Sequence, residues 1–171
     1  MEIWDLYNLE RKVIGEHIRG NELPEDGFHL VVHVWIKNSE GKYLMTQRSA
    51  NKSSFPLFWE CVGGSVLKGE NSIQGAVREV KEEVGVEFRA DEGKLLFTKV
   101  RKTIDGKRYN DIVDVWLFIY DGALQLDNAT TDEVAQNKWM SKKEIEKLKE
   151  ENKLVYSIKD LDYFFDEMED N

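Results

Sequence analysis

The segment from Gly64 to Val86 constrains the fold more than any other part of the chain, because it predicts a helix with two very different faces. Asn71 or Ser72 can cap the start of this helix, and Gly85 is typical of the residue that ends one. Branched apolar residues share one stripe of the helix, namely Ile73, Val77, Val80 and Val84. Carboxylates share another stripe, namely Glu79, Glu82 and Glu83. The apolar stripe should pack on a sheet, and the other stripe has to tolerate clustered negative charge.

A stripe of glutamates is usually a solvated surface, but its neighbours here favour a second interpretation. Adjacent like charges destabilise a helix by a few tenths of a kcal/mol per pair, and Arg78 is the cation beside them, able to orient Glu82 or to reach Glu70. Gly75 lies one turn before Glu79, where a missing side chain is expected to leave room for a ligand. Mg²⁺ commonly joins one or two carboxylates to substrate phosphates. The stripe therefore indicates either a charged surface or a cation site.

The rest of the chain reads as strands and turns, followed by helices. A hairpin is expected within residues 4–18, and strands are expected at residues 28–38, 42–49, 59–66, 94–104 and 109–120. The third of these strands should end at a Gly-Gly break, and the last two should pair around Asp105-Gly106. Ser141–Glu144 is a capping box that opens a helix, and residues 157–168 predict another. This order favours an α+β fold, an α/β/α sandwich with a mixed sheet between helices.

Size and composition limit the function classes. A chain of 171 residues indicates one domain, 1–171, divided into an N-terminal hairpin (1–27), a core (28–140) and C-terminal helices (141–171). The net charge of −9 argues against nucleic-acid binding. No apolar run approaches the roughly 20 residues of a membrane span, no secretory signal is visible, and the single cysteine, Cys61, fits a reducing cytoplasm. Size and composition exclude neither a homodimer nor a small phosphorylated ligand that is held through a metal.

The segment resembles a complete Nudix box. Gly64 is followed after five residues by Glu70, and after seven more by the run 78–86, REVKEEVGV, so that every specified position matches. Average residue usage would produce this in about one chain in ten million. The resemblance implies a metal-dependent pyrophosphohydrolase with a Nudix fold. Such enzymes cleave a nucleoside diphosphate linked to another moiety, or a similar diphosphate, with Mg²⁺ or Mn²⁺. It also implies that Gly64 and Glu70 shape the loop and that Arg78 braces it.

The resemblance assigns roles to the carboxylates. Glu79 and Glu83 are the best metal ligands, and Glu82 shares the metal or activates water. Cations on this stripe would neutralise phosphate charge and lower the pKa of a bound water. Some Nudix enzymes take a general base from a loop such as TTDEVAQNKWM, which makes Glu133 a candidate, with a surface carboxylate as the alternative.

Residues outside the box indicate a function less specifically than those within it. Arg48 and Lys52 precede the box loop and either clamp substrate phosphates or carry surface charge. His29 and His33 share one face of a strand and are either packed or ligands of a second metal. Cys61 is expected to be a packed thiol.

An isomerase remains the main alternative, and a sensor domain that binds a nucleotide without cutting it is the third. Residues 28–60 are similar to isopentenyl-diphosphate isomerases of the same fold, which places the chain in the subgroup similar to them. The matching residues there and beyond are His29, Arg48, Lys52 and Asp111. The departures are Gly63 at the position of the catalytic cysteine, Ser65 at that of a histidine, and Tyr109 at that of a carboxylate. These departures and the intact box favour hydrolysis.

Overall fold

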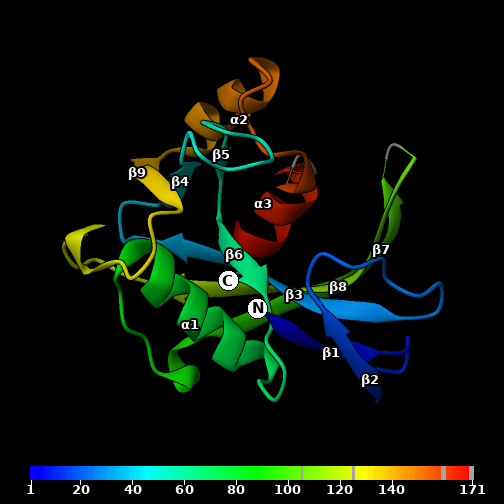
Figure 1. The fold of residues 1–171 in the computed structure, drawn as a ribbon. Helices are drawn as coiled ribbons and strands as arrows, with labels where there is room; N and C mark the ends of the chain where they lie inside the picture. Colours follow the sequence, from blue (N-terminus) through cyan, green and yellow to red (C-terminus); the bar gives the residue numbers. More distant parts are fainter. Residues whose placement is uncertain (105, 125, 159–160, 170–171) are drawn as a thin grey trace.

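The computed structural model describes residues 1–104, 106–124, 126–158 and 161–169, and it places a mixed sheet between helices (Figure 1). The strands are β1 (Ile3–Tyr7), β2 (Val13–Ile18), β3 (Phe28–Lys37), β4 (Tyr43–Arg48), β5 (Trp59–Glu60), β6 (Val62–Ser65), β7 (Lys94–Ile104), β8 (Lys107–Ile119) and β9 (Val134–Met140). The helices are α1 (Ser72–Val84), α2 (Lys142–Glu150) and α3 (Leu161–Glu169), with short 3₁₀ turns at 90–92, 126–128 and 156–158.

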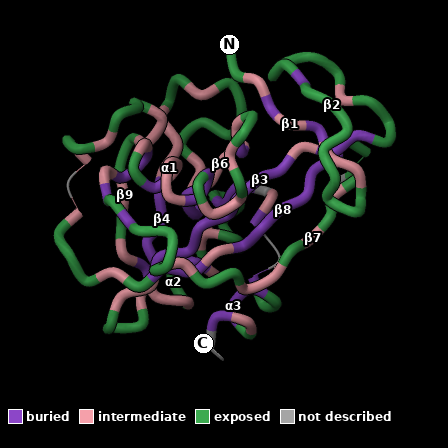
Figure 2. The backbone as a smooth tube through the Cα atoms, turned by 90° about the horizontal axis from the view of Figure 1, so that it is seen from below, coloured by how far each residue is buried: buried purple, intermediate pink, exposed green. Residues whose placement is uncertain are grey.

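Strand β3 is the centre of the sheet. It runs parallel to β8, with His29 opposite Asp111 and Lys37 opposite Ile119, and antiparallel to β1 and β6. It meets β4, the next strand in sequence, at the single pair Lys37 and Tyr43. Both edges of β3 are therefore paired, and the buried part of the chain follows β3 and β8 (Figure 2).

Two hydrophobic cores lie on opposite faces of the sheet. On one face the α1 residues Val80 and Val84 pack with Val32 and Val34 of β3. On the other face α3 packs against the sheet through a cluster that contains Trp35, Tyr43, Leu161, Phe164 and Phe165. This arrangement confirms the predicted α/β/α sandwich. Within the described residues, no helix is long and apolar enough to cross a bilayer.

The predicted hairpins are confirmed, whereas the predicted Gly-Gly break is wrong. Strand β1 pairs with β2, and β7 pairs with β8, although Asp105 of the second turn lies outside the described residues. Gly63 and Gly64 lie inside β6, opposite His33 and Val32. A Cβ atom at Gly63 would lie 2.3 Å from the Val32 carbonyl oxygen. Glycine here permits a close approach of two strands and does not end the strand.

Candidate active site

Helix α1 begins and ends where its sequence predicts. The Asn71 side chain accepts a hydrogen bond from the Gln74 amide (3.0 Å), and the Gln74 side chain accepts one from the Asn71 amide (2.9 Å). Gly85 ends the helix with φ at +72°, and its amide donates to the Lys81 carbonyl. Left-handed backbone of this kind favours glycine. These two local signals set the limits of the helix.

Arg78 joins the box loop, residues 66–71 between β6 and α1, to the helix. Its guanidinium donates two hydrogen bonds to Glu70 (2.8 and 3.0 Å) and one to the Ser65 carbonyl (2.9 Å). It also donates to Glu79 (2.8 Å) and Glu82 (3.0 Å). One cation thus contacts three of the predicted carboxylates. The bracing role predicted for Arg78 matches these contacts.

Two glycines of this region have different neighbours. A Cβ atom at Gly64 would lie 2.4 Å from a carboxylate oxygen of Glu79, so glycine lets this side chain lie against β6. A Cβ atom at Gly75 would lie 2.8 Å from Cγ2 of Val66. The expectation that Gly75 leaves room for a ligand is therefore wrong, because the Val66 side chain fills that space.

A cavity of about 420 Å³ brings most of the predicted residues together. Its predicted lining residues are Arg48, Lys52, Gly64, Arg78, Glu79, Glu82, Glu83 and Glu133. Glu70 does not line it and lies behind Arg78. Glu2 and Arg19 of the N-terminal hairpin also line the cavity and form an ion pair of 2.7 Å. Sequence reasoning missed both, since nothing in a surface hairpin signals that it reaches a distant helix.

The N-terminal hairpin also holds the box loop. The Asp5 carboxylate accepts a hydrogen bond from the Gly69 amide (2.8 Å), and the Ile3 carbonyl accepts one from the Lys68 amide (2.8 Å). The loop of the box is thus bonded to β1 as well as to Arg78.

The buried carboxylates are costly to ionise. Glu83 is only 6% exposed. Burial, with the nearby Glu60, Glu79 and Glu133, raises its pKa well above the ordinary value. Burial also raises the pKa of Glu79 to about 7, although Arg78 acts in the opposite direction. The helix therefore holds carboxylates that need positive charge beyond what Arg78 supplies.

The cations of the cavity are paired with acids. Arg48 contacts Glu60 at 2.6 Å, and Lys52 forms an ion pair with Glu133. The structure thus brings Arg48, Lys52 and Glu133 to the cavity, as their predicted roles require. Glu60, on the short strand β5, was not foreseen.

The donor set fits a hard divalent cation only in part. Across the described residues, no three side chains of His, Cys, Asp or Glu are arranged to hold one metal ion. Mg²⁺ does not need such a cage, because it commonly uses one or two carboxylates together with waters and substrate phosphates. Glu79 and Glu83 supply that chemistry, and a bound cation would offset the cost of their burial.

The histidines do not form a pair. His29 stacks on Trp4 with ring centroids 4.4 Å apart. His33 lines a second cavity, other than the one lined by the α1 carboxylates. Four positions along a strand separate their backbones by about 13 Å, which does not favour a shared metal ion.

The NUDIX domain family matches residues 27–161. The chain belongs to the Nudix family. An uncharacterised Nudix hydrolase of Listeria monocytogenes is 35% identical over 157 residues, which cover 91% of this chain and 89% of that protein. A solved structure from Deinococcus radiodurans matches with a TM-score of 0.66 and 24% identity, covering 84% of this chain and 86% of its own, and supports the fold. The chain is accordingly a Nudix enzyme, a hydrolase of pyrophosphate bonds.

The isomerase resemblance is much shorter. An isopentenyl-diphosphate Δ-isomerase of Klebsiella pneumoniae is 37% identical over 61 residues, which cover 35% of this chain and 33% of the isomerase. So short a match leaves the subgroup within the family open.

Proposed function

We propose that this chain is a Mg²⁺- or Mn²⁺-dependent pyrophosphohydrolase that cleaves a nucleoside diphosphate linked to another moiety, or a similar diphosphate. The observation that carries the proposal is a single cavity that both the carboxylates of α1 and the basic residues Arg48 and Lys52 line. The acidic side chains suit a divalent cation, and the basic ones suit phosphate oxygens.

The proposed role of each side chain follows from its burial and its ion pairs. Glu79 and Glu83 would hold the cation, which when bound neutralises phosphate charge and favours attack by water. Glu82 is more open, with 34% of its side chain exposed, and can accept a proton from the attacking water. Arg48 and Lys52 bind the diphosphate. A phosphate that takes Lys52 also releases Glu133 from its ion pair and makes this carboxylate available as a base.

A screen of diphosphates with Mg²⁺ and with Mn²⁺, detecting released phosphate or monophosphate, tests the proposal. On the best substrate, Glu82→Gln and Glu83→Gln should each lower kcat by at least about a hundredfold, because each removes a group that holds the cation or handles the proton. Glu87→Gln is the matched control, since Glu87 pairs with Lys81 away from the cavity. Near wild-type turnover in both cavity variants would show that the site is wrongly assigned.

An isomerase is the second candidate, because a short stretch of the chain matches an isopentenyl-diphosphate isomerase and residues 28–60, with His29, Arg48 and Lys52, resemble that family. Isomerisation of an allylic diphosphate needs a proton donor and an acceptor on opposite sides of the carbon skeleton. Gly63 offers neither, and Cys61 is 3% exposed with its thiol pKa raised by burial. We therefore expect no dimethylallyl diphosphate from isopentenyl diphosphate by NMR, and unchanged diphosphate hydrolysis in Cys61→Ser. Isomerisation that is lost in Cys61→Ser would reverse this assignment.

A further inference from the structure

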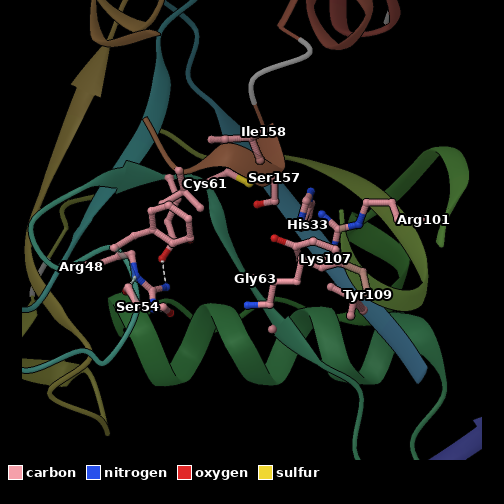
Figure 3. A pocket seen from close by; sticks show the side chains of 15 residues that line it. His33, Arg48, Ser54, Cys61, Gly63, Arg101, Lys107, Tyr109, Ser157 and Ile158 are labelled. Atoms are coloured by element: carbon pink, nitrogen blue, oxygen red, sulfur yellow. Dashed lines mark hydrogen bonds and ion pairs between the residues drawn. The ribbon is translucent and has the colours of Figure 1, made fainter. Parts of the chain in front are cut away.

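A second cavity, of about 240 Å³, adjoins the first across β6 (Figure 3). Val31, Arg48, Gly63 and Gly64 line both cavities. A substrate with its diphosphate between Arg48 and the acids of α1 can therefore extend its other end past the two glycines into the second cavity. The side chains there decide which end groups fit.

Arg101, on β7, lines this cavity with one nitrogen unused. Its Nε and Nη2 atoms donate to the two oxygens of Asp111 at 2.7 and 2.6 Å. The third nitrogen, Nη1, is buried and has no hydrogen-bond partner within the described residues. A guanidinium has donors in a fixed fork, so the ion pair with Asp111 holds this free donor in place.

His33, on β3, has a second nitrogen without a partner within the described residues. The residue is 7% exposed, and its buried Nδ1 atom has no partner in the part of the chain that the structure describes. Buried polar atoms nearly always have a partner, and leaving one unpaired costs about 1–3 kcal/mol. Two such atoms, Nδ1 of His33 and Nη1 of Arg101, belong to residues that line one cavity, which points to a ligand rich in hydrogen-bond acceptors.

Two basic side chains lie at the same end of the cavity, and the charge of one, Arg101, is offset by Asp111. Figure 3 shows His33, Arg101, Lys107 and Tyr109 on the side opposite Arg48. Arg101 and Lys107 both lie near the Tyr109 ring, at 5.3 and 5.7 Å from its centroid. In a chain with a net charge of −9, the Lys107 ammonium group is the positive charge that favours an anion here, beside the unused donor of Arg101.

We infer that this end of the cavity binds an anionic oxygen group, a phosphoryl or carboxylate, carried by the small moiety that is attached to the diphosphate. The inference rests on the proposed function for the place of the diphosphate. Nη1 of Arg101 and the Lys107 ammonium group donate to the anion, and the His33 ring donates through a nitrogen–hydrogen bond. The proposed diphosphate hydrolysis then acts on a molecule that carries a second anionic group.

The cavity suits a small polar moiety better than a nucleobase or an isoprenoid. Its 240 Å³ lies below the roughly 300–1,000 Å³ of sites for drug-sized ligands. Arg101 and Lys107 already lie near the Tyr109 ring, which leaves the ring less available for stacking on a base. Arg101 and Lys107 would lose hydration beside an apolar chain without gaining a partner.

Calorimetric binding to the full chain tests the inference without turnover. Ribose 5-phosphate and ribonate are the phosphoryl and carboxylate probes, and ribose is the uncharged one. The acidic probe that binds more tightly should bind at least tenfold more tightly than ribose. Which of the two acidic probes this is identifies the preferred anion. Lys107→Met should weaken this binding about tenfold, as expected for a charge-assisted contact. His33→Phe, which keeps the ring but loses its nitrogens, should weaken it about threefold or more.

Two control variants locate the bound probe. Arg108→Met changes the next residue of β8, which does not line the cavity, and should leave affinity within about twofold. Lys52→Met alters only the first cavity and should also preserve binding. Equal binding of ribose and the acidic probes, or full affinity in both Lys107→Met and His33→Phe, would overturn the inference. Arg101 is left intact because its loss would strand the buried Asp111 carboxylate.

Hydrolysis separates this inference from the proposed function. The compound 5-phosphoribosyl 1-diphosphate carries a terminal anion, and isopentenyl diphosphate does not. Lys107→Met should raise KM about tenfold for the first and leave KM for the second unchanged. Acidic-probe binding without hydrolysis of any diphosphate would support the cavity and refute the proposed function. Hydrolysis with the same KM in wild type and Lys107→Met would refute the role of the cavity alone.

Discussion

The raised pKa of Glu79 makes the metal-free protein less stable at high pH, and Glu79→Gln should remove that loss. The pKa is about 7 in the fold against an ordinary 4.5. The folded state therefore binds more protons than the unfolded state between these values, and stability falls as pH rises through this window. At about 1.4 kcal/mol per pH unit, the loss is about 1 kcal/mol at pH 5 and about 3 kcal/mol at pH 8.

The measurement is urea unfolding with a chelator present, at pH 5 and pH 8, for wild type and Glu79→Gln. Other groups titrate in the same range, so only the difference between the two proteins is informative. Burial lowers the pKa of His29 to about 4 and that of His33 well below its usual value. Both histidines make stability rise with pH, but they do so equally in the two proteins. The variant should exceed wild type by about 3 kcal/mol at pH 8, which is roughly 1–2 M in the urea midpoint.

Two results would refute this reasoning. A variant no more stable than wild type at pH 8 would mean that Arg78 compensates the charge of Glu79 after all. A gain of equal size at pH 5 and pH 8 would point to packing and not to titration. Mg²⁺ supplies an independent check, because an ion that binds only the folded state stabilises it. Saturating Mg²⁺ should therefore raise the stability of wild type at pH 8 more than that of the variant.

Three further substitutions test separate contacts. Arg48→Ala should weaken substrate binding by roughly 1.5–3 kcal/mol through loss of a charge-assisted contact, and an unchanged KM would assign Arg48 to the surface. Gly64→Ala should lower kcat/KM by at least about tenfold, because its methyl group would displace the Glu79 carboxylate; wild-type kinetics would exclude that clash. Arg11→Met should cost about 3 kcal/mol in thermal unfolding, since it removes the cation that binds the buried Asp114 at 2.7 and 2.8 Å and leaves this carboxylate with neutral hydroxyl donors such as that of Thr98. An unchanged Tm would show that this ion pair is dispensable.

Sequence reasoning succeeded where the signals are local. The limits of α1 follow from Asn71 and Gly85, and its two faces follow from helical periodicity, so the grouping of Glu79, Glu82 and Glu83 was predictable. The box loop lies within reach of Arg78 for the same reason.

It failed where distant strands decide the outcome. Arg101 and Glu60 reach their cavities through the pairing of β7 with β8 and of β4 with β5, which no local pattern reports. The other wrong predictions concerned glycines. A position without a side chain equally allows a ligand or a neighbouring residue to approach. Val66 at Gly75 and the Val32 carbonyl at Gly63 show the second outcome, and only the folded structure distinguishes the two.

The hydrogen bonds from β1 to the box loop have a consequence for comparing enzymes of this family. The match to the family begins at residue 27, yet Ile3 and Asp5 hold the backbone of Lys68 and Gly69. Two family members with the same box and different leader segments would therefore hold this loop with different rigidity. A chimaera that exchanges residues 1–26 between such enzymes would alter the motion of the loop while every motif residue stays the same. Catalytic differences between near relatives can in this way originate in a segment that motif alignments leave out.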